Sequence, residues 1–168
     1  YGADTLRMYE MFIGDFEKTA PWNTSSIKGV KRFLERVAAL TDMMTQEDGY
    51  SAELEGSFHK LIKKVSEDIE GLKCNTAIAA MMSVLNEIYD KGSVTRGELM
   101  TFITLLNPFA PHITEEINEA IGGKEMLAKT KWPEYDPAKC VDADVEIAVQ
   151  VSGKIKARLM IPSDSTEE

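Results

Sequence analysis

The sequence has few cysteines, no long apolar run and no excess of basic residues. Its two cysteines, Cys74 and Cys140, lie far apart and form no C-x-x-C pair, so we expect a reducing compartment and no disulfide framework. No apolar run approaches the ~20 residues that a membrane-spanning helix needs. The formal net charge of −9 argues against indiscriminate binding to polyanions such as nucleic acids.

The motifs of common catalytic and cofactor sites are also missing. There is no Gly-rich phosphate loop, no H-E-x-x-H and no G-x-S-x-G. Neither histidine has a partner at metal-ligand spacing; we expect His59 on the solvated side of a helix and His112, after Pro111, in a cap or a local hydrogen bond. The sequence therefore predicts no catalytic residues, no cofactor-binding residues and no metal ligands.

What the chain does contain is helical periodicity. With 168 residues, 43% of them hydrophobic, it can bury a core without disulfides or metal. Apolar residues recur at helical spacing, which predicts helices over 4–12, 23–44, 54–72, 75–92, 95–106 and 111–121. Asp4 and Asn75 are predicted N-caps, and Thr95 with Glu98 is a capping-box pair. The stripes of the second and third helices are Ile27, Val30, Phe33, Leu34, Val37, Leu40 and Met44, and Leu54, Phe58, Leu61, Ile62, Val65, Ile69 and Leu72.

After residue 123 the pattern changes. Residues 124–144 lack periodicity and read as a connector, and residues 145–161 alternate apolar and polar positions across Ser152-Gly153, which predicts a β-hairpin. The fold is thus predicted as mainly α, an antiparallel bundle of five to six helices followed by a short β-hairpin. We expect three parts: a helical domain (1–123), a connector (124–144) and the truncated start of a further domain (145–168). The absent initial methionine and the helix-start pattern of residues 163–168 also suggest a piece of a longer protein.

Basic residues cluster locally in spite of the acidic total. Basic side chains of the second predicted helix project roughly opposite its apolar stripe, with Arg36 on the flank of the stripe, and those of the third predicted helix do the same. The basic side chains of the hairpin are expected on one strand face, because alternate residues share a face. Solvated surface positions and phosphate contacts both fit this pattern. The clusters are Lys28, Lys31, Arg32 and Arg36; Lys60, Lys63 and Lys64; and Lys154, Lys156 and Arg158.

Several longer sequence segments resemble segments of one enzyme family. They occur in the same order as in that family and cover essentially the whole chain. Residues 1–12 resemble the segment after the KMSKS loop of class I aminoacyl-tRNA synthetases, and Ala20-Pro21-Trp22 with residues 32–37 is similar to the leucine enzymes. Further segments similar to this family are residues 75–79, 107–116 and 132–136. Residues 145–154 resemble the opening of the small C-terminal domain of bacterial leucyl-tRNA synthetases.

The resemblance implies a function. The parent enzyme would attach leucine to its tRNA with ATP and magnesium, and this chain would be its noncatalytic anticodon-binding helical domain, inactive alone. Its partners would be leucine tRNA and the catalytic and C-terminal parts of the same chain, in a monomeric cytoplasmic enzyme. The candidate RNA-binding residues are Lys28, Lys31, Arg32, Arg36, Lys154, Lys156 and Arg158.

Arg7 and Trp22 would instead hold the bundle to the catalytic body. The alternatives are a helical protein-interaction bundle without RNA binding and, third, a small enzyme of unrecognised type.

Overall fold

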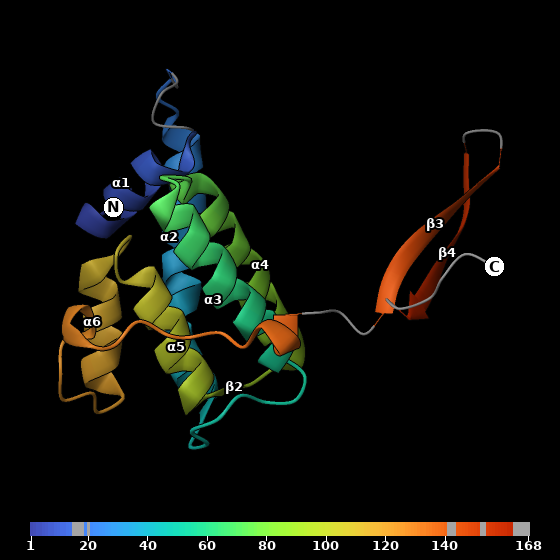
Figure 1. Cartoon of the computed structure of the whole chain (residues 1–168). Coiled ribbons are helices and arrows are strands. Elements are labelled where there is room, and N and C mark those ends of the chain that lie inside the picture. The colour runs from blue at the N-terminus through green and yellow to red at the C-terminus, as the bar shows by residue number, and fades with distance from the viewer. Residues whose placement is uncertain (15–18, 20, 141–143, 152–153, 163–168) are drawn as a thin grey trace.

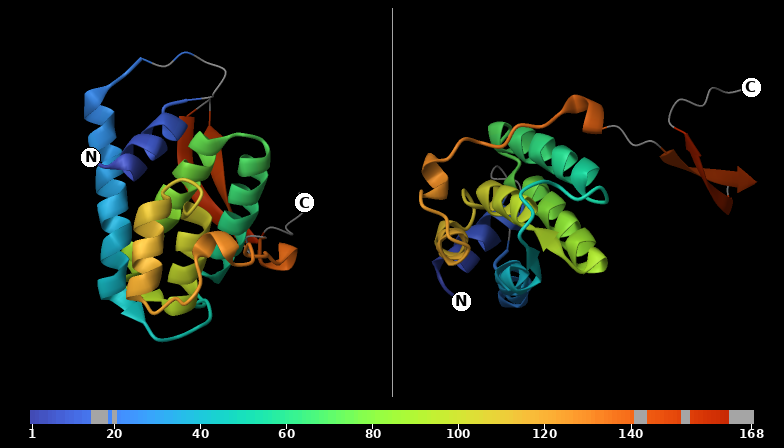
Figure 2. Two further views of the ribbon diagram at one scale, coloured as in Figure 1. Left: turned by 90° about the vertical axis from the view of Figure 1, so that its left-hand side faces the viewer. Right: turned by 90° about the horizontal axis from the view of Figure 1, so that it is seen from below.

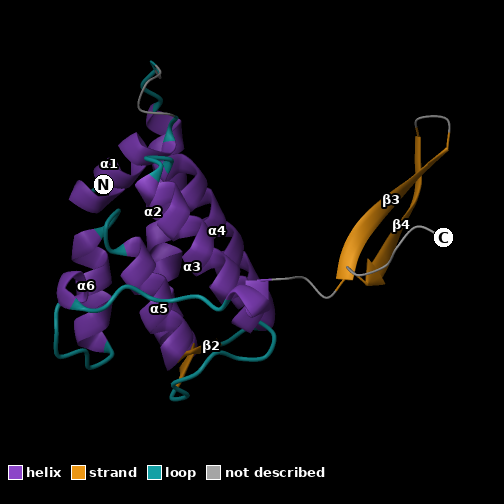
Figure 3. Ribbon diagram, in the orientation of Figure 1, coloured by secondary structure: helices purple, strands orange, loops and turns teal. Residues whose placement is uncertain are grey.

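The computed structural model describes residues 1–14, 19, 21–140, 144–151 and 154–162, and side chains up to residue 140. This described part is mainly helical, as predicted, with six α-helices followed by two paired strands (Figures 1 and 3). The predicted Ser152-Gly153 turn and the predicted helix start at 163–168 lie outside it. The helices are α1 (Ala3–Phe12), α2 (Thr24–Ala38), α3 (Glu55–Glu70), α4 (Cys74–Lys91), α5 (Arg96–Leu106) and α6 (Pro111–Ala120).

Helix α2 buries the predicted stripe and ends earlier than predicted. Its N-cap is Asn23, whose side-chain oxygen accepts a hydrogen bond from the Ser25 N–H at 2.9 Å. Residues 39–43 form a 3₁₀ turn, η1 (Ala39–Met43), and Met44 begins a strand. The predicted extension of the helix to Met44 is therefore wrong. The buried members of the stripe are Ile27, Val30, Phe33, Leu34, Val37 and Leu40.

Helices α3 and α4 pack side by side as the longest pair of the bundle, and α1 lies against α2 and α4 (Figure 2). Two predictions at their ends are wrong. Leu72 does not belong to the buried stripe, because α3 ends at Glu70 and Leu72 has a left-handed backbone (φ 55°) and 70% exposure. Asn75 does not cap α4, since that helix already begins at Cys74 and has no side-chain cap.

A short parallel strand pair, not predicted, joins two distant loops. Strand β1 (Met44–Thr45) pairs with β2 (Val94–Thr95). Next to it the predicted capping box of α5 is confirmed: Thr95 Oγ1 accepts from the Glu98 N–H at 3.0 Å, and Glu98 Oε2 accepts from the Thr95 N–H at 2.8 Å. Glu98 is fully buried and also accepts a 2.8 Å hydrogen bond from the Ser51 N–H. One carboxylate thus ties the 45–51 loop to the start of α5.

The start of α6 is capped by a residue of α1, which is distant in sequence but packs against α6. Asp4 lies inside the first turn of α1, whose N-cap is Gly2, so the prediction of Asp4 as the cap of α1 is wrong. Its carboxylate instead accepts from the Ile113 N–H at 2.8 Å and lies 2.7 Å from His112 Nδ1. His112 thus forms a hydrogen bond, but the prediction of a local partner is wrong, since Asp4 lies 108 residues away in the sequence.

Residues 132–140, which we call the strap, run from the α6 end of the bundle along α3 (Figure 1). Trp132 Nε1 donates to Ser66 Oγ at 2.8 Å, the Asp136 N–H donates to His59 Nδ1 at 3.0 Å, and Lys139 Nζ lies 2.7 Å from Glu55 Oε1. His59 is only 7% exposed, so its predicted solvated position is wrong. It is covered because the strap lies over this part of α3 and donates a backbone N–H to it.

Beyond the strap, β3 (Asp144–Val151) and β4 (Lys154–Pro162) pair antiparallel, which confirms the predicted hairpin. The register is interrupted between Val149 and Gln150. One extra residue on β4 therefore breaks the strict alternation. The predicted common strand face of Lys154, Lys156 and Arg158 concerns side chains that lie outside the described residues.

Candidate nucleic-acid interface

The basic residues of α2 form one row on its exposed side. Lys28, Arg32 and Arg36 follow at intervals of four residues, which places them above one another on a helix. Lys28 and Arg32 are exposed, whereas Arg36 is partly buried. Lys31 lies beside the row, and its Nζ is 3.3 Å from Glu35 Oε1 in an exposed ion pair. Such a pair exchanges readily with water and salt, so Lys31 remains available to a phosphate group.

Arg36 differs from the others because its guanidinium is held by α4. Nη1 donates to Asn86 Oδ1 at 2.9 Å, and the guanidinium carbon lies 4.4 Å from the centre of the Tyr89 ring. The Tyr89 hydroxyl in turn donates to the Arg36 carbonyl oxygen at 2.9 Å. These contacts join α2 to α4, and they make packing rather than ligand binding the use of Arg36 that the geometry favours.

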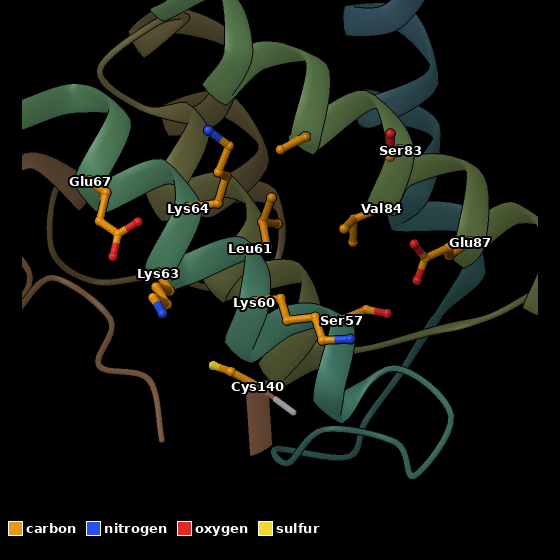
Figure 4. A pocket seen from close by; sticks show the side chains of 11 residues that line it. Ser57, Lys60, Leu61, Lys63, Lys64, Glu67, Ser83, Val84, Glu87 and Cys140 are labelled. Carbon is orange, nitrogen blue, oxygen red and sulfur yellow. The ribbon is translucent and has the colours of Figure 1, made fainter. Parts of the chain in front are cut away.

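The basic residues of α3 line a groove between α3 and α4 with a volume of about 720 Å³ (Figure 4). Lys60, Lys63 and Lys64 come from one wall, and Glu87 comes from the other. Cys140, the last residue of the strap, closes one edge. Sequence reasoning found these lysines through their i, i+3, i+4 spacing, but it could not place α4 opposite them.

The remaining candidates lie in the hairpin. Lys154, Lys156 and Arg158 all belong to β4, where Lys154 pairs with Val151 and Arg158 with Ala148. Their side chains lie outside the described residues. The structure therefore places these three in one strand and brings none of them into a described contact with the candidates on α2.

Arg7 and Trp22, the predicted contacts to the catalytic body, behave differently from each other. Arg7 Nη2 donates to the Pro108 carbonyl oxygen at 3.1 Å, so its guanidinium binds the bundle itself. Trp22 is 60% exposed and meets Tyr9 edge to face with ring centres 5.0 Å apart. Trp22 thus keeps most of its indole exposed while Tyr9 fixes its position.

The described residues contain little reactive chemistry. No group of three or more His, Cys, Asp or Glu side chains in them could hold a metal ion. Both cysteines are free, and burial raises the pKa of Cys74, which makes its thiolate less available as a nucleophile. No described helix is both long enough and apolar enough to cross a membrane. The amines and guanidinium groups that gather on the described faces of α2 and α3 can bind anions.

Comparison with known proteins agrees with this geometry. The family model described as the anticodon-binding domain of tRNA ligase matches residues 52–168. The leucine–tRNA ligase of Alkaliphilus oremlandii is 51% identical over 168 residues, and that of Chlorobaculum tepidum is 44% identical over 174 residues. Each alignment covers 100% of this chain but only 21% and 22% of the relative. The chain thus spans about a fifth of the length of these relatives.

A solved structure extends the similarity to three dimensions. The crystal structure of the ternary complex of Agrobacterium radiobacter K84 agnB2 LeuRS-tRNA-LeuAMS superposes with a TM-score of 0.81 and 30% sequence identity. The match covers 99% of this chain and 24% of the Agrobacterium radiobacter chain. The family match, the full-length identity to leucine–tRNA ligases and the shared fold lead to one conclusion. The chain belongs to the family of anticodon-binding domains of tRNA ligases, and the relatives named above are leucine–tRNA ligases.

Proposed function

We propose that this chain serves as a noncatalytic tRNA-binding and scaffold domain of a leucine–tRNA ligase. The observation that carries the proposal is the fold similarity, over 99% of this chain, to a synthetase solved together with tRNA. The whole protein would use ATP and magnesium to attach leucine to its tRNA. The 168-residue chain would be inactive alone, since its described residues offer anion-binding groups rather than a reactive centre.

The proposed organisation follows from the change in sequence pattern. Residues 1–123 form the helical anticodon-binding domain, an antiparallel bundle, residues 124–144 are the connector, and residues 145–168 begin the C-terminal domain. The partners are leucine tRNA and the catalytic and C-terminal parts of the same chain, in a monomeric cytoplasmic protein. Trp22 supplies the contact to the catalytic part, with its exposed indole as the supporting observation.

The proposed RNA contacts on α2 are Lys28, Lys31 and Arg32. The hairpin residues Lys154, Lys156 and Arg158 remain candidates, whereas Arg36 acts mainly through its contacts with α4. These contacts would go to phosphates, so they would orient the RNA without reading its sequence. A few of them within a large interface are compatible with a net charge of −9.

A titration tests the proposal. Leucine tRNA and an unrelated tRNA are each titrated with the chain at two salt concentrations. The same titrations are made with the double variants K28E/R32E and K124E/K129E, which change the net charge by the same amount at different places on the bundle. We expect weak, salt-sensitive binding of both RNAs and a loss only in K28E/R32E. In parallel, leucine-dependent ATP–pyrophosphate exchange by the chain should be zero, and any signal would refute its noncatalytic role.

The alternative is a helical protein-interaction bundle without RNA binding. Exposed apolar side chains near the N-terminus favour it, among them Tyr1 and Trp22, each 60% exposed. It predicts no tRNA binding even at low salt and no effect of K28E/R32E in the full-length protein. Detectable binding that weakens with salt would exclude it.

A further inference from the structure

Helix α3 ends in a turn whose backbone geometry favours glycine, but the residue there is Leu72. The Leu72 N–H donates to the Ile69 carbonyl oxygen at 3.1 Å. The Lys73 N–H donates to the Asp68 carbonyl oxygen at 2.7 Å, which completes the hydrogen-bond pair of a Schellman motif. In this motif the residue at Leu72 is left-handed, and its φ is 55°. A Cβ atom raises the energy of that conformation, so leucine makes the turn less stable than glycine would.

Two other helices of the bundle end with glycine at a left-handed position. Gly92 after α4 and Gly122 after α6 have φ values of 81° and 84°. Leu72 is the only residue other than glycine with a positive φ in the part of the chain that the structure describes. Its side chain is mostly exposed, so packing within the bundle offsets little of the strain. Backbone strain of this kind clusters at functional sites, and the exposed isobutyl group is the part of Leu72 that a partner could contact.

Other exposed apolar side chains lie at the same end of the bundle as Leu72. The α3–α4 turn is found there together with the C-terminal end of α1 and the start of α2 (Figures 1 and 2). Ile13 follows α1, and Trp22 precedes α2 and is fixed against Tyr9. Ile13 and Trp22 are both exposed. We call Ile13, Trp22 and Leu72 the apolar end.

The charges beside the apolar end favour a protein partner over RNA. The exposed charged residues that the structure describes within three positions of its members are Glu10, Glu70 and Lys73, and they carry a net negative charge. An RNA backbone requires cations, whereas apolar and aromatic groups with few charges are typical of the centre of a protein–protein contact. This chain covers only 21% and 22% of the two leucine–tRNA ligases to which it is similar, so the rest of such a protein is large enough to supply the opposing surface.

We propose that the apolar end docks through Leu72, Ile13 and Trp22 onto an apolar surface of the catalytic part of the same protein. The docking rests on the proposed function, which makes this chain one part of a leucine–tRNA ligase, and it adds Leu72 and Ile13 to the contact of Trp22. The strain at Leu72 is offset only in the whole protein, where the contact removes the leucine side chain from water.

The first test measures whether Leu72 is covered in the full-length protein. A thiol is introduced by Leu72→Cys or, as the control, by Met126→Cys, each combined with Cys74→Ser and Cys140→Ser. Met126 is also an exposed apolar residue, but it lies beyond α6. Alkylation by an uncharged maleimide is followed by peptide mass spectrometry without tRNA, and each rate is divided by the rate of the same variant in urea. The thiol of Leu72→Cys should react at least about tenfold more slowly than the control, because a covered thiol reacts only when the contact opens.

Three outcomes of this alkylation would overturn the docking. Equal relative rates for Leu72→Cys and Met126→Cys would mean that nothing covers the apolar end. Protection that appears only after leucine tRNA is added would assign the apolar end to RNA. Protection that disappears when the protein is diluted would assign it to a second copy of the protein.

A second test separates the contact from the folding of the turn. Leu72→Asn keeps a residue type that tolerates the left-handed conformation but removes the apolar side chain. The half-life of leucine-dependent ATP–pyrophosphate exchange by the full-length protein is measured at one elevated temperature. Leu72→Asn should shorten it about 5- to 30-fold, the range expected when most of a buried leucine side chain is lost. The control Met126→Asn should change it by less than about 2-fold.

Equal half-lives of Leu72→Asn and the unaltered protein would refute the docking. Absence of any leucine-dependent exchange by the unaltered full-length protein would instead refute the proposed function, and the alkylation rates would still report whether Leu72 is covered.

Discussion

Glu98 gives the sharpest test of how the bundle is held together. Its carboxylate is fully buried, and it accepts the N–H groups of Ser51 and Thr95, each at 2.8 Å, as well as the Ser51 hydroxyl. Lys91 Nζ lies 3.7 Å away and is the only described cation paired with it. Removing the carboxylate would leave buried donors and a mostly buried ammonium group without their partner.

The expected cost follows from these contacts. Breaking a buried, hydrogen-bonded charge pair by removing one partner costs about 3–5 kcal/mol. Glu98→Ala should lower the free energy of unfolding by this amount. Glu98→Gln should cost about 1.5–3 kcal/mol, because its amide keeps one acceptor oxygen but turns an NH₂ group toward N–H donors. The exposed neighbour Glu53 is the control, and Glu53→Ala should change stability by less than about 0.5 kcal/mol.

The assay is urea-induced unfolding of the chain followed by circular dichroism at 222 nm. The slope m should remain similar among the variants, so that shifts of the midpoint report stability. A cost below about 1 kcal/mol for Glu98→Ala would contradict the reasoning, since it would mean that the carboxylate is not the common acceptor for the loop and the helix.

Three further predictions concern other parts of the bundle. Gly97→Ala should destabilise the chain by about 1–3 kcal/mol in the same urea assay, because the added Cβ would lie 2.1 Å from the Asp48 carbonyl oxygen. The control Gly29→Ala, at a position with open space around it, should stabilise the chain by about 0.5–1 kcal/mol. Equal effects of the two substitutions would refute the close approach of Gly97 to Asp48. His59→Leu should remove the acceptor of the strap and speed proteolysis between residues 132 and 140, and unchanged cleavage there would contradict the strap. Since burial raises the pKa of Cys74, its alkylation near pH 8 should be slower in the folded chain than in urea, and the difference should shrink as the pH rises above the folded-state pKa and both forms become thiolate.

Much of the helical part could be predicted from the sequence, because local signals and the final packing agree there. The stripe of α2 is buried almost as expected, and the Thr95–Glu98 capping box forms as its spacing indicates. Proline at the start of α6 and the left-handed Gly92 after α4 also follow from backbone preferences that need no tertiary context.

The errors arise where a residue's partner is far away in the sequence. Asp4 is a residue type that often caps its own helix, yet its carboxylate accepts a hydrogen bond from the first turn of α6. His59 occupies a polar helix face that a distant strap covers. The parallel β1–β2 pair joins residues about 50 positions apart and is only two residues long, so it has no periodicity to detect.

Only part of the candidate site could be predicted from the sequence, because some of its contacts join residues that are far apart in the sequence. Spacing along one helix places Lys28 and Arg32 in a row, and the structure keeps both exposed. The commitment of Arg36 to Asn86 and Tyr89 depends on α4 and has no local signal. Likewise, the lysines of α3 become a groove only when α4 and Cys140 lie beside them.

The central claim is that this bundle supports an RNA backbone while the reaction takes place elsewhere in the protein. Ultraviolet cross-linking of leucine tRNA to the full-length protein, with the attached peptides identified by mass spectrometry, tests it most directly. The account predicts cross-linked peptides within residues 24–38 or 55–67, and their loss at high salt. Efficient cross-linking of the tRNA to other parts of the protein, with none inside residues 1–168, would contradict it.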